Sequence, residues 1–522
     1  MNAADVTPQP AQAAQTEARE FPAGSYVVRM DQPYSRIADA LLDYQYWSPT
    51  EPQRNPYDDT GWTFPEGFGV QAIRVTDLKV LDVPVERVTG KITAPGGVSG
   101  SGSVFVINAN GDNALATLRY RLKDADMQAA EEPFEAGGTR FARGSCVIRG
   151  VSQAALDAAT RELGLRAHAL ASAPSVPMHP LRAARVAVMH TWQSTQTEGW
   201  WRQALDFSGI PYEYISTQEP KKIGNLNARF DVIIFGPGGG SGIGVIEGMP
   251  MWRNPLPWKN TPETPNIGTW AQTDDMRPGL GWDGLVALKN FVKNGGVLIT
   301  SGSSADFALQ FGLVNGVSSS TPQRGTVDGS LLRTRIVDDA SPLVYGVKDS
   351  LAVYSASGET FGVSATAGGG RGGGGGGGRG GGSGSRETGR GTPDDRDQVQ
   401  GFAQLDPRFL PPTRPTVQPW QYAIPTEEQF RNPLGIIPPD QRPRVALRYE
   451  AQNALLVSGL LSGGGDVAQR PVVVDAPLER GHVILFANNP LYRGSTIGSY
   501  TLVFNTILNF DNLNAGRKLD TR

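Results

Sequence analysis

With 522 residues, of which 39% are hydrophobic, the chain is long enough for more than one domain core. Its net charge of -3 gives no electrostatic reason to expect a nucleic acid or an anionic membrane surface as a partner. A single cysteine, Cys146, excludes an intramolecular disulfide and a thiolate metal cluster.

Residues 1 to 24 are predicted to be a disordered tail. The first 20 are rich in Ala, Gln, Thr and Glu and have no apolar core, so they are neither a secretory signal peptide nor a membrane anchor. No run of 18 apolar residues occurs in the chain, so we expect no membrane span. So plain a start could also belong to a truncated part of a longer protein.

Residues 25 to 180 are predicted to be a separate N-terminal α+β accessory domain. Ser35 should cap a helix from Arg36 to Tyr44, and a second helix should end near Gly164. The aromatic loop from Tyr44 to Trp62 could line a peptide or sugar surface, but packing against a neighbouring region is favoured. Residues 169 to 180, with three prolines, are predicted to be a linker. The strand-like runs are 26–30, 70–75, 102–107, 116–120 and 145–148, and the second helix is 154–163.

Residues 181 to 350 and 440 to 522 alternate short apolar runs with helical segments, the pattern of buried parallel strands in βαβ units. We therefore predict an α/β domain with a doubly wound, mainly parallel, flavodoxin-like sheet. Such sheets bind ligands at the carboxyl ends of their strands, where these runs change to Gly, Ser, Thr or Pro. The expected strands are 186–189, 232–235, 297–300, 444–449, 455–457 and a hairpin of 471–475 with 482–486; the expected helices are 200–205, 284–293, 305–311 and 499–510.

Residues 351 to 439 are predicted to be a Gly/Pro-rich, largely disordered insert. Positions 368 to 384 contain 14 glycines and no hydrophobic side chain that would offset the entropy of an ordered backbone. Arginines among glycines are typical of RNA-binding tails, but those tails interleave aromatic residues, and none occurs from Ser364 to Gln400. We therefore expect no nucleic acid partner.

Two strand exits are candidate functional motifs. Residues 236 to 242 lack the Lys-Ser/Thr ending of a P-loop, so a tight strand exit is favoured over a phosphate cradle. Residues 300 to 304 have a strand–elbow–helix pattern, which in other proteins exposes a nucleophile. Ser301 or Ser303 would be that nucleophile, with His190 as its base.

The four histidines limit metal chemistry. None begins an H-x-x-E or H-E-x-x-H pair, which would place zinc ligands on one helix face. His482 lies inside a predicted strand and is expected to be a packed side chain. We therefore predict no metal site and no cofactor in this chain.

Residues 231 to 238 and 295 to 302 resemble the class I glutamine amidotransferase fold. In that family the third strand ends in G-x-C-x-G and a late strand ends in H-P-E, which completes a Cys-His-Glu triad. Matched position by position, Thr300 stands at the cysteine, Asn489 at the histidine and Leu491 at the glutamate. Glutaminase chemistry needs a thiolate beside a base, so the resemblance implies the fold without the activity.

Three further stretches carry a second resemblance: residues 26 to 34, His190-Thr191-Trp192 with Gly199-Trp200, and residues 489 to 493. Together they look like the C-terminal accessory region of large bacterial carboxypeptidase A-type zinc peptidases. In that family a metallopeptidase domain precedes such a region, and its zinc motif is not located here. The resemblance implies kinship with hydrolases, a zinc carboxypeptidase domain as partner, and a periplasmic or extracellular location.

Two functions from different classes remain open. The first is a non-catalytic accessory or binding region, a peptidase-associated pseudoenzyme. The second is a hydrolase or peptidase-family enzyme that acts through an unrecognised site at the carboxyl edge of the sheet. Whether this chain is an enzyme, which ligand it takes and how it oligomerises are left open.

Both functions place the site at the strand ends. We expect His190, Ser303 and Asn489 to lie within about 10 Å of one cavity. Glu198 and Arg493 would supply opposite charges at its rim, and tryptophan walls would suit a sugar or a peptide end better than a phosphate. The candidate binding residues are His190, Trp192, Glu198, Trp201, Ser301, Ser303, Ser304, Asn489 and Arg493.

Overall fold

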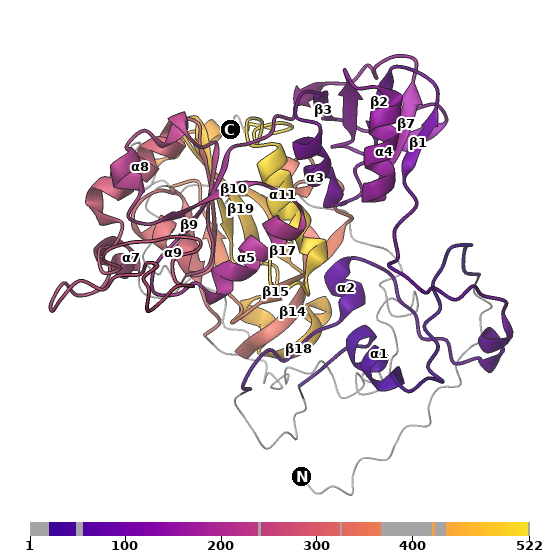
Figure 1. The fold of residues 1–522 in the computed structure, drawn as a ribbon, viewed down its shortest axis with the longest axis horizontal. Helices are drawn as coiled ribbons and strands as arrows, with labels where there is room; N and C mark the ends of the chain where they lie inside the picture. Colours follow the sequence, from indigo (N-terminus) through magenta and orange to yellow (C-terminus); the bar gives the residue numbers. More distant parts are fainter. Residues whose placement is uncertain are drawn as a thin grey trace, which may run out of the picture.

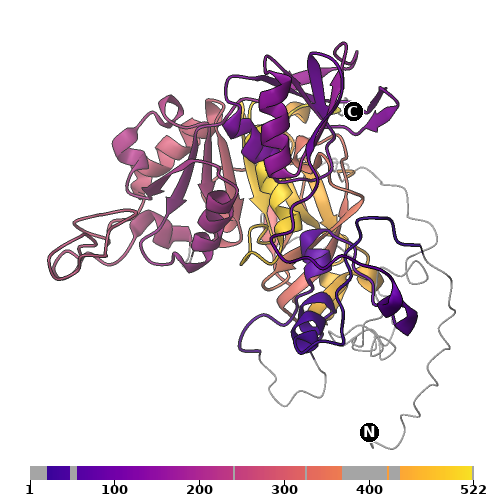
Figure 2. The same ribbon diagram turned by 45° about the vertical axis from the view of Figure 1, so that its right-hand side comes forward.

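The computed structural model describes residues 20–47, 56–238, 242–323, 326–366, 420–422 and 435–519. The predicted tail up to residue 19 and the glycine-rich run lie outside the described residues. A large central sheet carries packed helices, with a smaller sheet beside it and an irregular N-terminal segment below (Figure 1, Figure 2). Within the described ranges, no helix has the length and apolar character needed to cross a membrane.

The central sheet has ten strands in the order β10-β9-β11-β12-β20-β19-β17-β14-β15, and β18 also pairs with β14. Most of the predicted strands of the α/β region are confirmed, with ends within a few residues. The bounds are β9 Val186–His190, β10 Tyr212–Ser216, β11 Val232–Phe235, β12 Val297–Ser301, β14 Thr326–Ile336, β15 Ser350–Ser355, β17 Arg444–Tyr449, β18 Leu456–Ser462, β19 Pro471–Leu478 and β20 Gly481–Phe486.

The two halves of this sheet differ in strand direction. β10, β9, β11, β12 and β20 are parallel neighbours. From β20 onward every pair is antiparallel, starting with the predicted β19–β20 hairpin. The α/β class is confirmed, but the sheet is mixed rather than mainly parallel. Connection length is the reason, since the two residues between β19 and β20 leave no room for the crossover helix that parallel strands require.

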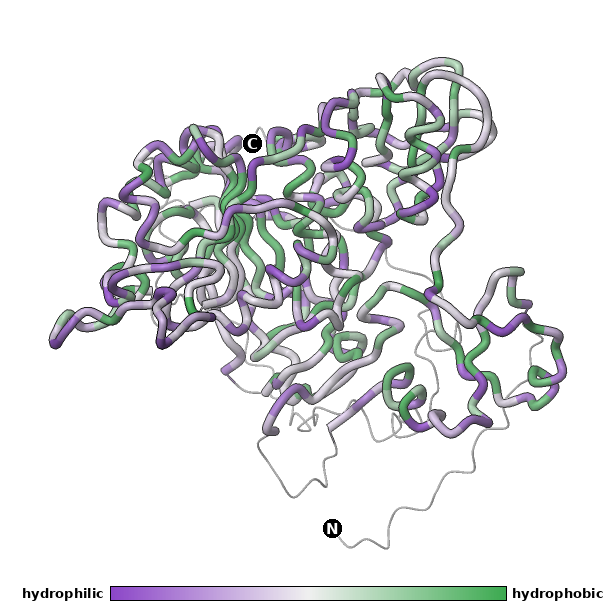
Figure 3. The backbone as a smooth tube through the Cα atoms, in the orientation of Figure 1, coloured by the Kyte–Doolittle hydropathy of each residue, from purple (hydrophilic) through white to green (hydrophobic). Residues whose placement is uncertain are grey.

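The core lies around the parallel strands. Every residue of β9, β11, β12 and β20 is buried, which explains why these strands are continuous apolar runs instead of alternating ones. Figure 3 shows them as a block of hydrophobic tube inside a more polar exterior. The helices of this region are α5 Gln196–Phe207, α6 Pro220–Ile223, α7 Gly242–Glu247, α8 Gly281–Lys293, α9 Ser303–Gln310 and α11 Tyr500–Leu508.

The smaller sheet has six strands in the order β1-β7-β2-β6-β3-β8. The predicted helix that ends near Gly164 is confirmed, because Gly164 caps α4 in the left-handed conformation at φ 70°. The predicted strand at 116–120 is wrong, since these residues form α3, which packs against α11. The predicted linker contains β8, which pairs with β3. The bounds are β1 Gly97–Gly100, β2 Val104–Ile107, β3 Asp126–Ala130, β6 Cys146–Arg149, β7 Arg166–Leu170, β8 Met178–Pro180, α3 Ala114–Arg121 and α4 Gln153–Leu163.

The described residues of the N-terminal segment, 20–47 and 56–96, contain little regular structure. Helix α1 (Ser35–Leu42) is confirmed, but its cap residue is Tyr34, and no side chain caps it. The strands predicted at 26–30 and 70–75 are wrong, because these runs form no strand and pair with no other strand among the described residues. Their apolar side chains are correspondingly exposed, such as Tyr26 and Val70. The propensity for a strand is not sufficient without a neighbouring strand to complete its hydrogen bonds.

The remaining short elements lie at the edges. The predicted insert, residues 351 to 439, begins inside β15, and its residues 360 to 363 form β16, which pairs with β13. Its first part is therefore ordered strand, contrary to the prediction. The loop 44–62 packs against the antiparallel half, as predicted, through the buried Tyr44 and a bridge from Tyr46 to Gly459. The other bounds are α2 Phe64–Phe68, β4 Phe134–Ala136, β5 Thr139–Phe141, β13 Val317–Ser320 and β16 Thr360–Val363.

Candidate functional site

The carboxyl ends of the parallel strands bring together residues from four distant parts of the sequence. The register pairs His190 with Ser216, Phe235 with Thr300, and Ser301 with Phe486. The chain therefore leaves β9, β11, β12 and β20 at one edge of the sheet. This is the edge at which open α/β sheets place their ligands.

His190 is the last residue of β9 and is 2% exposed. Its ring stacks on Tyr214, with 4.1 Å between the ring centroids, and meets Trp192 edge-on at 4.8 Å. Burial lowers the pKa of His190 to about 4, so the imidazole is neutral at pH 7. Nδ1 lies 3.1 Å from the carbonyl oxygen of Thr191, which only accepts, so Nδ1 carries the proton. Nε2 is therefore a bare acceptor, and it has no partner among the described residues.

Glu198 lies on α5 and is also 2% exposed, so it is buried and does not form the predicted charged rim. The Tyr214 hydroxyl donates to its Oε2 at 3.0 Å. Its Oε1 is buried without a hydrogen-bond partner in the described part of the chain. Burial raises the pKa of Glu198 to about 7, despite the opposing effects of Tyr214 and Arg202.

Trp201 and Asn489 link α5 to the end of β20. The Trp201 indole is fully buried, and its Nε1 donates to Asn489 Oδ1 at 2.9 Å. The side chain of the preceding residue, Asn488, is 1% exposed, and neither its amide nitrogen nor its amide oxygen has a partner in the described residues. The sequence analysis did not select Asn488 as a candidate binding residue, because the match to the family's H-P-E motif placed Asn489 at the histidine.

The strand–elbow–helix pattern is real, but its turn lies at Gly302. This residue has φ 55° and ψ -123°, the strained geometry of a sharp turn from strand β12 to helix α9. A Cβ atom built at Gly302 would have no atom within 4 Å. Thr300, matched to the amidotransferase cysteine, is instead an interior strand residue whose hydroxyl donates to the Ile484 carbonyl. Thr300 is therefore not at the turn, which a glycine occupies.

The hydroxyl groups of the three candidate serines donate hydrogen bonds to main-chain carbonyl oxygens. Ser301 Oγ donates to the Asn488 carbonyl at 2.8 Å, and Ser304 Oγ donates to the Phe235 carbonyl at 2.5 Å. Ser303 Oγ donates to the carbonyl of Gly238 and accepts from its amide. None of the three hydroxyls is hydrogen-bonded to His190, so the described residues contain no such Ser–His pair to activate a nucleophile here.

Arg493 and Leu491 are separate from this group. The Arg493 guanidinium lies 2.9 Å from both Asp58 and Asp59, and these contacts hold the N-terminal segment on the antiparallel half. Leu491 is fully buried in the core. Arg493 is therefore engaged by Asp58 and Asp59, whereas it was predicted to supply a charge opposite to that of Glu198 at the rim of the cleft.

The contacts of Arg202 with three aromatic side chains were not predicted. Arg202 lies over the Tyr214 ring at 4.1 Å and over the Trp270 ring at 4.6 Å, and it donates to the Tyr212 hydroxyl. These contacts connect the site to the segment between α7 and α8. A cavity of about 20 Å³, large enough for about one water molecule, lies between Trp192 and the base of this segment. His190, Ser303 and Asn489, which were expected to surround one cavity, do not line it. Its lining includes Thr191, Trp192, Thr217, Gly248, Met276 and Pro278.

No family model and no curated protein matches this chain. Solved structures match weakly. A GMP synthase-type protein from Thermoplasma acidophilum is 7% identical at a TM-score of 0.29, over 62% of this chain and 92% of that one. PurLQS from Thermotoga maritima is 12% identical at a TM-score of 0.30, over 62% of this chain and 98% of that one. A β-galactosidase from Bacillus circulans is 10% identical at 0.27, over 63% of this chain and 31% of that one.

The first two of these neighbours have glutamine amidotransferase-type folds. At such low identities and TM-scores the similarities carry no argument about activity or ligand. The assignment to the α/β class rests on the strand pairings described above, and any function rests on the residues of the site.

Proposed function

We propose that this chain is a non-catalytic binding module whose pocket lies at the carboxyl edge of the parallel half-sheet. The observation that carries the proposal is the glycine at the strained turn. A nucleophile elbow exposes its reactive side chain at such a position, and Gly302 has none. The neighbouring hydroxyls donate to main-chain carbonyls, and the nearby imidazole is neutral at pH 7.

The unpaired polar atoms at the carboxyl edge of the sheet favour a small, uncharged ligand that both donates and accepts hydrogen bonds. Of the residues that carry these atoms, Trp192 lines the cavity, whereas His190 and Asn488 do not. His190 Nε2 is an acceptor, Trp192 Nε1 is a donor, and the Asn488 amide offers both. Buried polar groups without partners are costly, so a ligand that pairs with several of them gains that free energy on binding. The rings of Trp192 and Tyr214 add apolar walls. A sugar or a peptide end fits these requirements better than a phosphate does.

Access to the pocket requires movement. The cavity of about 20 Å³ is far smaller than the few hundred Å³ of typical ligand pockets. Part of its lining comes from Gly248, Met276 and Pro278, which belong to the segment that joins α7 to α8. A ligand of sugar size therefore enters only if the base of this segment shifts away from Thr191 and Trp192.

The experiment is a titration monitored by ligand-observed NMR, with neutral monosaccharides and N-acetylated dipeptides as probes and inorganic phosphate as the anionic comparison. We expect a neutral probe to bind, and Asn488→Ala to weaken it by about 10-fold or more because two hydrogen bonds are lost. Asn110→Ala, which alters an exposed asparagine, is the matched control. Binding of phosphate alone, or equal effects of the two variants, would contradict the proposal.

We further propose that the module is a peptidase-associated region related to secreted zinc carboxypeptidases. The stretches 26–34, 190–200 and 489–493 support this kinship. Among the described residues no group of three His, Cys, Asp or Glu side chains is arranged to hold a metal ion. The test is metal analysis of the purified protein, together with incubation of peptides bearing free C-termini with and without zinc. Zinc-dependent release of C-terminal residues would contradict the non-catalytic assignment.

One observation favours a second candidate, a hydrolase that acts at the same edge. Glu198 titrates near pH 7 with one free oxygen, as a general acid or base does at neutral pH. The test is a panel of chromogenic esters and glycosides. Turnover that is lost in Glu198→Gln would support hydrolysis, and turnover that is equal in this variant would exclude Glu198 from it.

A further inference from the structure

The segment between α7 and α8 forms an irregular hairpin, residues 248 to 278, which we name the tryptophan hairpin. Its two legs pair at both ends. Gly248 bridges Pro278 near the sheet, and Trp258 exchanges two backbone hydrogen bonds of 2.9 Å with Thr273 further out. The hairpin projects from the sheet domain beside α7, at the lower left of the view (Figure 1). It lies next to the pocket but extends well beyond it.

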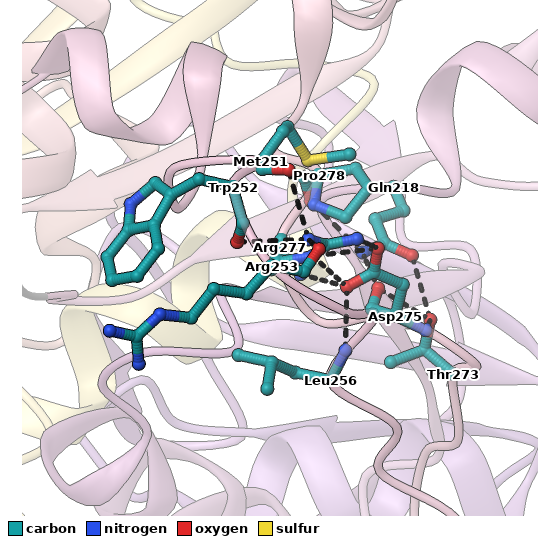
Figure 4. A network of polar contacts seen from close by, with 9 residues as sticks. All are labelled: Gln218, Met251, Trp252, Arg253, Leu256, Thr273, Asp275, Arg277 and Pro278. Carbon is teal, nitrogen blue, oxygen red and sulfur yellow. Dashed lines mark hydrogen bonds and ion pairs between the residues drawn. The ribbon is translucent and has the colours of Figure 1, made fainter.

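A buried arginine fixes the shape of this hairpin. Arg277 is 5% exposed and forms a two-pronged ion pair with Asp275, with its Nη2 2.6 Å from Oδ2. Its Nη1 donates to the main-chain carbonyls of Met251, Trp252 and Arg253 on the opposite leg. Gln218, from outside the hairpin, donates to the carbonyls of Asp275 and Pro278 and accepts from Thr273 (Figure 4).

This network joins both legs to the sheet domain, and six prolines in the hairpin further restrict its backbone. The hairpin is therefore preorganised, which reduces the entropy lost when a ligand binds to it.

Three tryptophan side chains of this hairpin are exposed to solvent. Trp252, Trp258 and Trp270 are 60%, 41% and 67% exposed. Two of them are braced by guanidinium groups: Arg253 lies 4.0 Å from the Trp252 centroid, and Arg202 lies 4.6 Å from that of Trp270. Figure 4 shows the Trp252 indole extending away from the Arg277–Asp275 pair. Soluble proteins rarely expose several large apolar rings on one element unless they serve an interaction.

The charge of the hairpin selects among ligands. It contains three acidic and three basic side chains, so its net charge is zero. Two of these pairs are neutralised internally, Arg277 with Asp275 and Lys259 with Asp274 at 2.6 Å. A neutral surface has no long-range attraction for an anionic lipid surface or for nucleic acid. Separate, rigid and neutral indole rings match the apolar faces of pyranose rings, whose hydroxyl groups remain in water.

We infer that the tryptophan hairpin is a carbohydrate-binding platform on which successive sugar units of a neutral polysaccharide pack against Trp252, Trp258 and Trp270. This function goes beyond the pocket at the sheet edge, because the platform binds a chain from the outside and requires no movement of the hairpin. The contact of Arg202 with both Tyr214 and Trp270 makes the platform continuous with the pocket.

The test is affinity electrophoresis of the full chain through gels that contain a soluble β-glucan, an α-glucan or a galactomannan. We expect at least one polymer to retard the unaltered protein. Trp252→Ala and Trp270→Ala should each weaken binding by about 10-fold, as is typical of aromatic residues that dominate an interface. Phe207→Ala is the matched control, since Phe207 is 83% exposed on α5 but lies outside the hairpin.

Asn488→Ala separates this inference from the proposed pocket, because it should leave retardation by the polymer unchanged while it weakens monosaccharide binding. Circular dichroism verifies that each variant is folded. Unchanged mobility of the unaltered protein in all three polymers would refute the platform. Equal loss of retardation in Phe207→Ala and Trp252→Ala would also refute it, as would binding to anionic lipid vesicles that depends on the same tryptophans.

Discussion

The two halves of the central sheet use buried polar side chains in different ways. In the antiparallel half, buried charges form pairs that hold other segments in place: Arg333 with Glu66 at 3.0 Å and Arg335 with Glu450 at 2.7 Å. In the parallel half, His190, Glu198 and Asn488 are at least as buried, yet each has a polar atom without a partner in the described residues. The antiparallel half also contains partnerless atoms in the described residues, such as Tyr449 Oη and Asp475 Oδ2, but its paired charges attach other segments. The charge pairs that attach segments therefore distinguish the first half, and the partnerless atoms near the strand ends distinguish the second.

The largest expected effect tests whether the paired charges of the antiparallel half hold the N-terminal segment in place. Glu66 is 9% exposed on α2 and accepts from both Arg333 and Tyr44. Arg333→Ala leaves this carboxylate buried without its cation, so we expect the free energy of unfolding to fall by about 3–5 kcal/mol. Urea unfolding followed by tryptophan fluorescence measures the change.

Arg29→Ala is the control for that variant, since Arg29 pairs with Asp31 on the exposed surface. Exposed pairs contribute little to stability because water screens them, so an equally small effect of Arg333→Ala would show that the pair does not attach the segment.

The pH dependence of stability tests the unpaired half. The pKa of Glu198 is about 7 in the folded protein against an ordinary value of 4.5, so this group loses its proton earlier in the unfolded chain. Stability should therefore fall as pH rises from 4.5 to 7, relative to Glu198→Gln, by about 3 kcal/mol in total. His190 acts in the opposite direction: its pKa falls from 6.5 to about 4, so its contribution rises with pH across that window.

The two groups largely offset each other in the unaltered protein, so the single variants are informative. Thermal unfolding of Glu198→Gln at several pH values should show stability rising from pH 4 to 6.5. His190→Gln should show the reverse, a fall between pH 4.5 and 7. Identical pH profiles for both variants and the unaltered protein would mean that neither group is buried as described.

The elbow offers a third test of the parallel half. Gly302 adopts φ 55° and ψ -123°, a conformation that strains any residue with a Cβ atom. Because a Cβ atom there would meet no neighbour within 4 Å, Gly302→Ala should cost only that backbone strain, about 1–3 kcal/mol. Gly138→Ala is a control in an ordinary left-handed turn at φ 73° with equal space. A similar loss in the two variants would contradict the strained turn.

Sequence patterns predicted the buried strands of the central sheet better than the structure of the N-terminal segment. Continuous apolar runs such as residues 232 to 235 identify buried parallel strands, because burial on both faces removes the alternation. The runs at 26–30 and 70–75 are also rich in apolar residues, although each contains an arginine, and they have no pairing strand among the described residues. Strand formation depends on a neighbour that is distant in sequence, and that information is not in the local pattern.

The site was predicted in part for the same reason. His190 and Asn489 were predicted to lie at one edge because strand ends in an α/β sheet meet there, and the structure places both at the carboxyl ends of β9 and β20. Tyr214 and Asn488 were missed, since nothing in their local sequence shows that one stacks on His190 and the other has an unpaired amide. The position of the turn was also missed, because only the backbone angles distinguish Gly302 from Thr300.

The smallest expected effect is at Thr300, and it distinguishes a strand residue from a site residue. The Thr300 hydroxyl donates to the Ile484 carbonyl inside the sheet, 3.1 Å away, and its side chain is fully buried. Thr300→Val keeps the shape and removes this one hydrogen bond, so stability should fall by about 1 kcal/mol. Binding of neutral probes should be unchanged, because Thr300 lies below the turn and presents no group to the pocket. A loss of binding as large as that in Asn488→Ala would return Thr300 to the site and restore the original match to the amidotransferase cysteine.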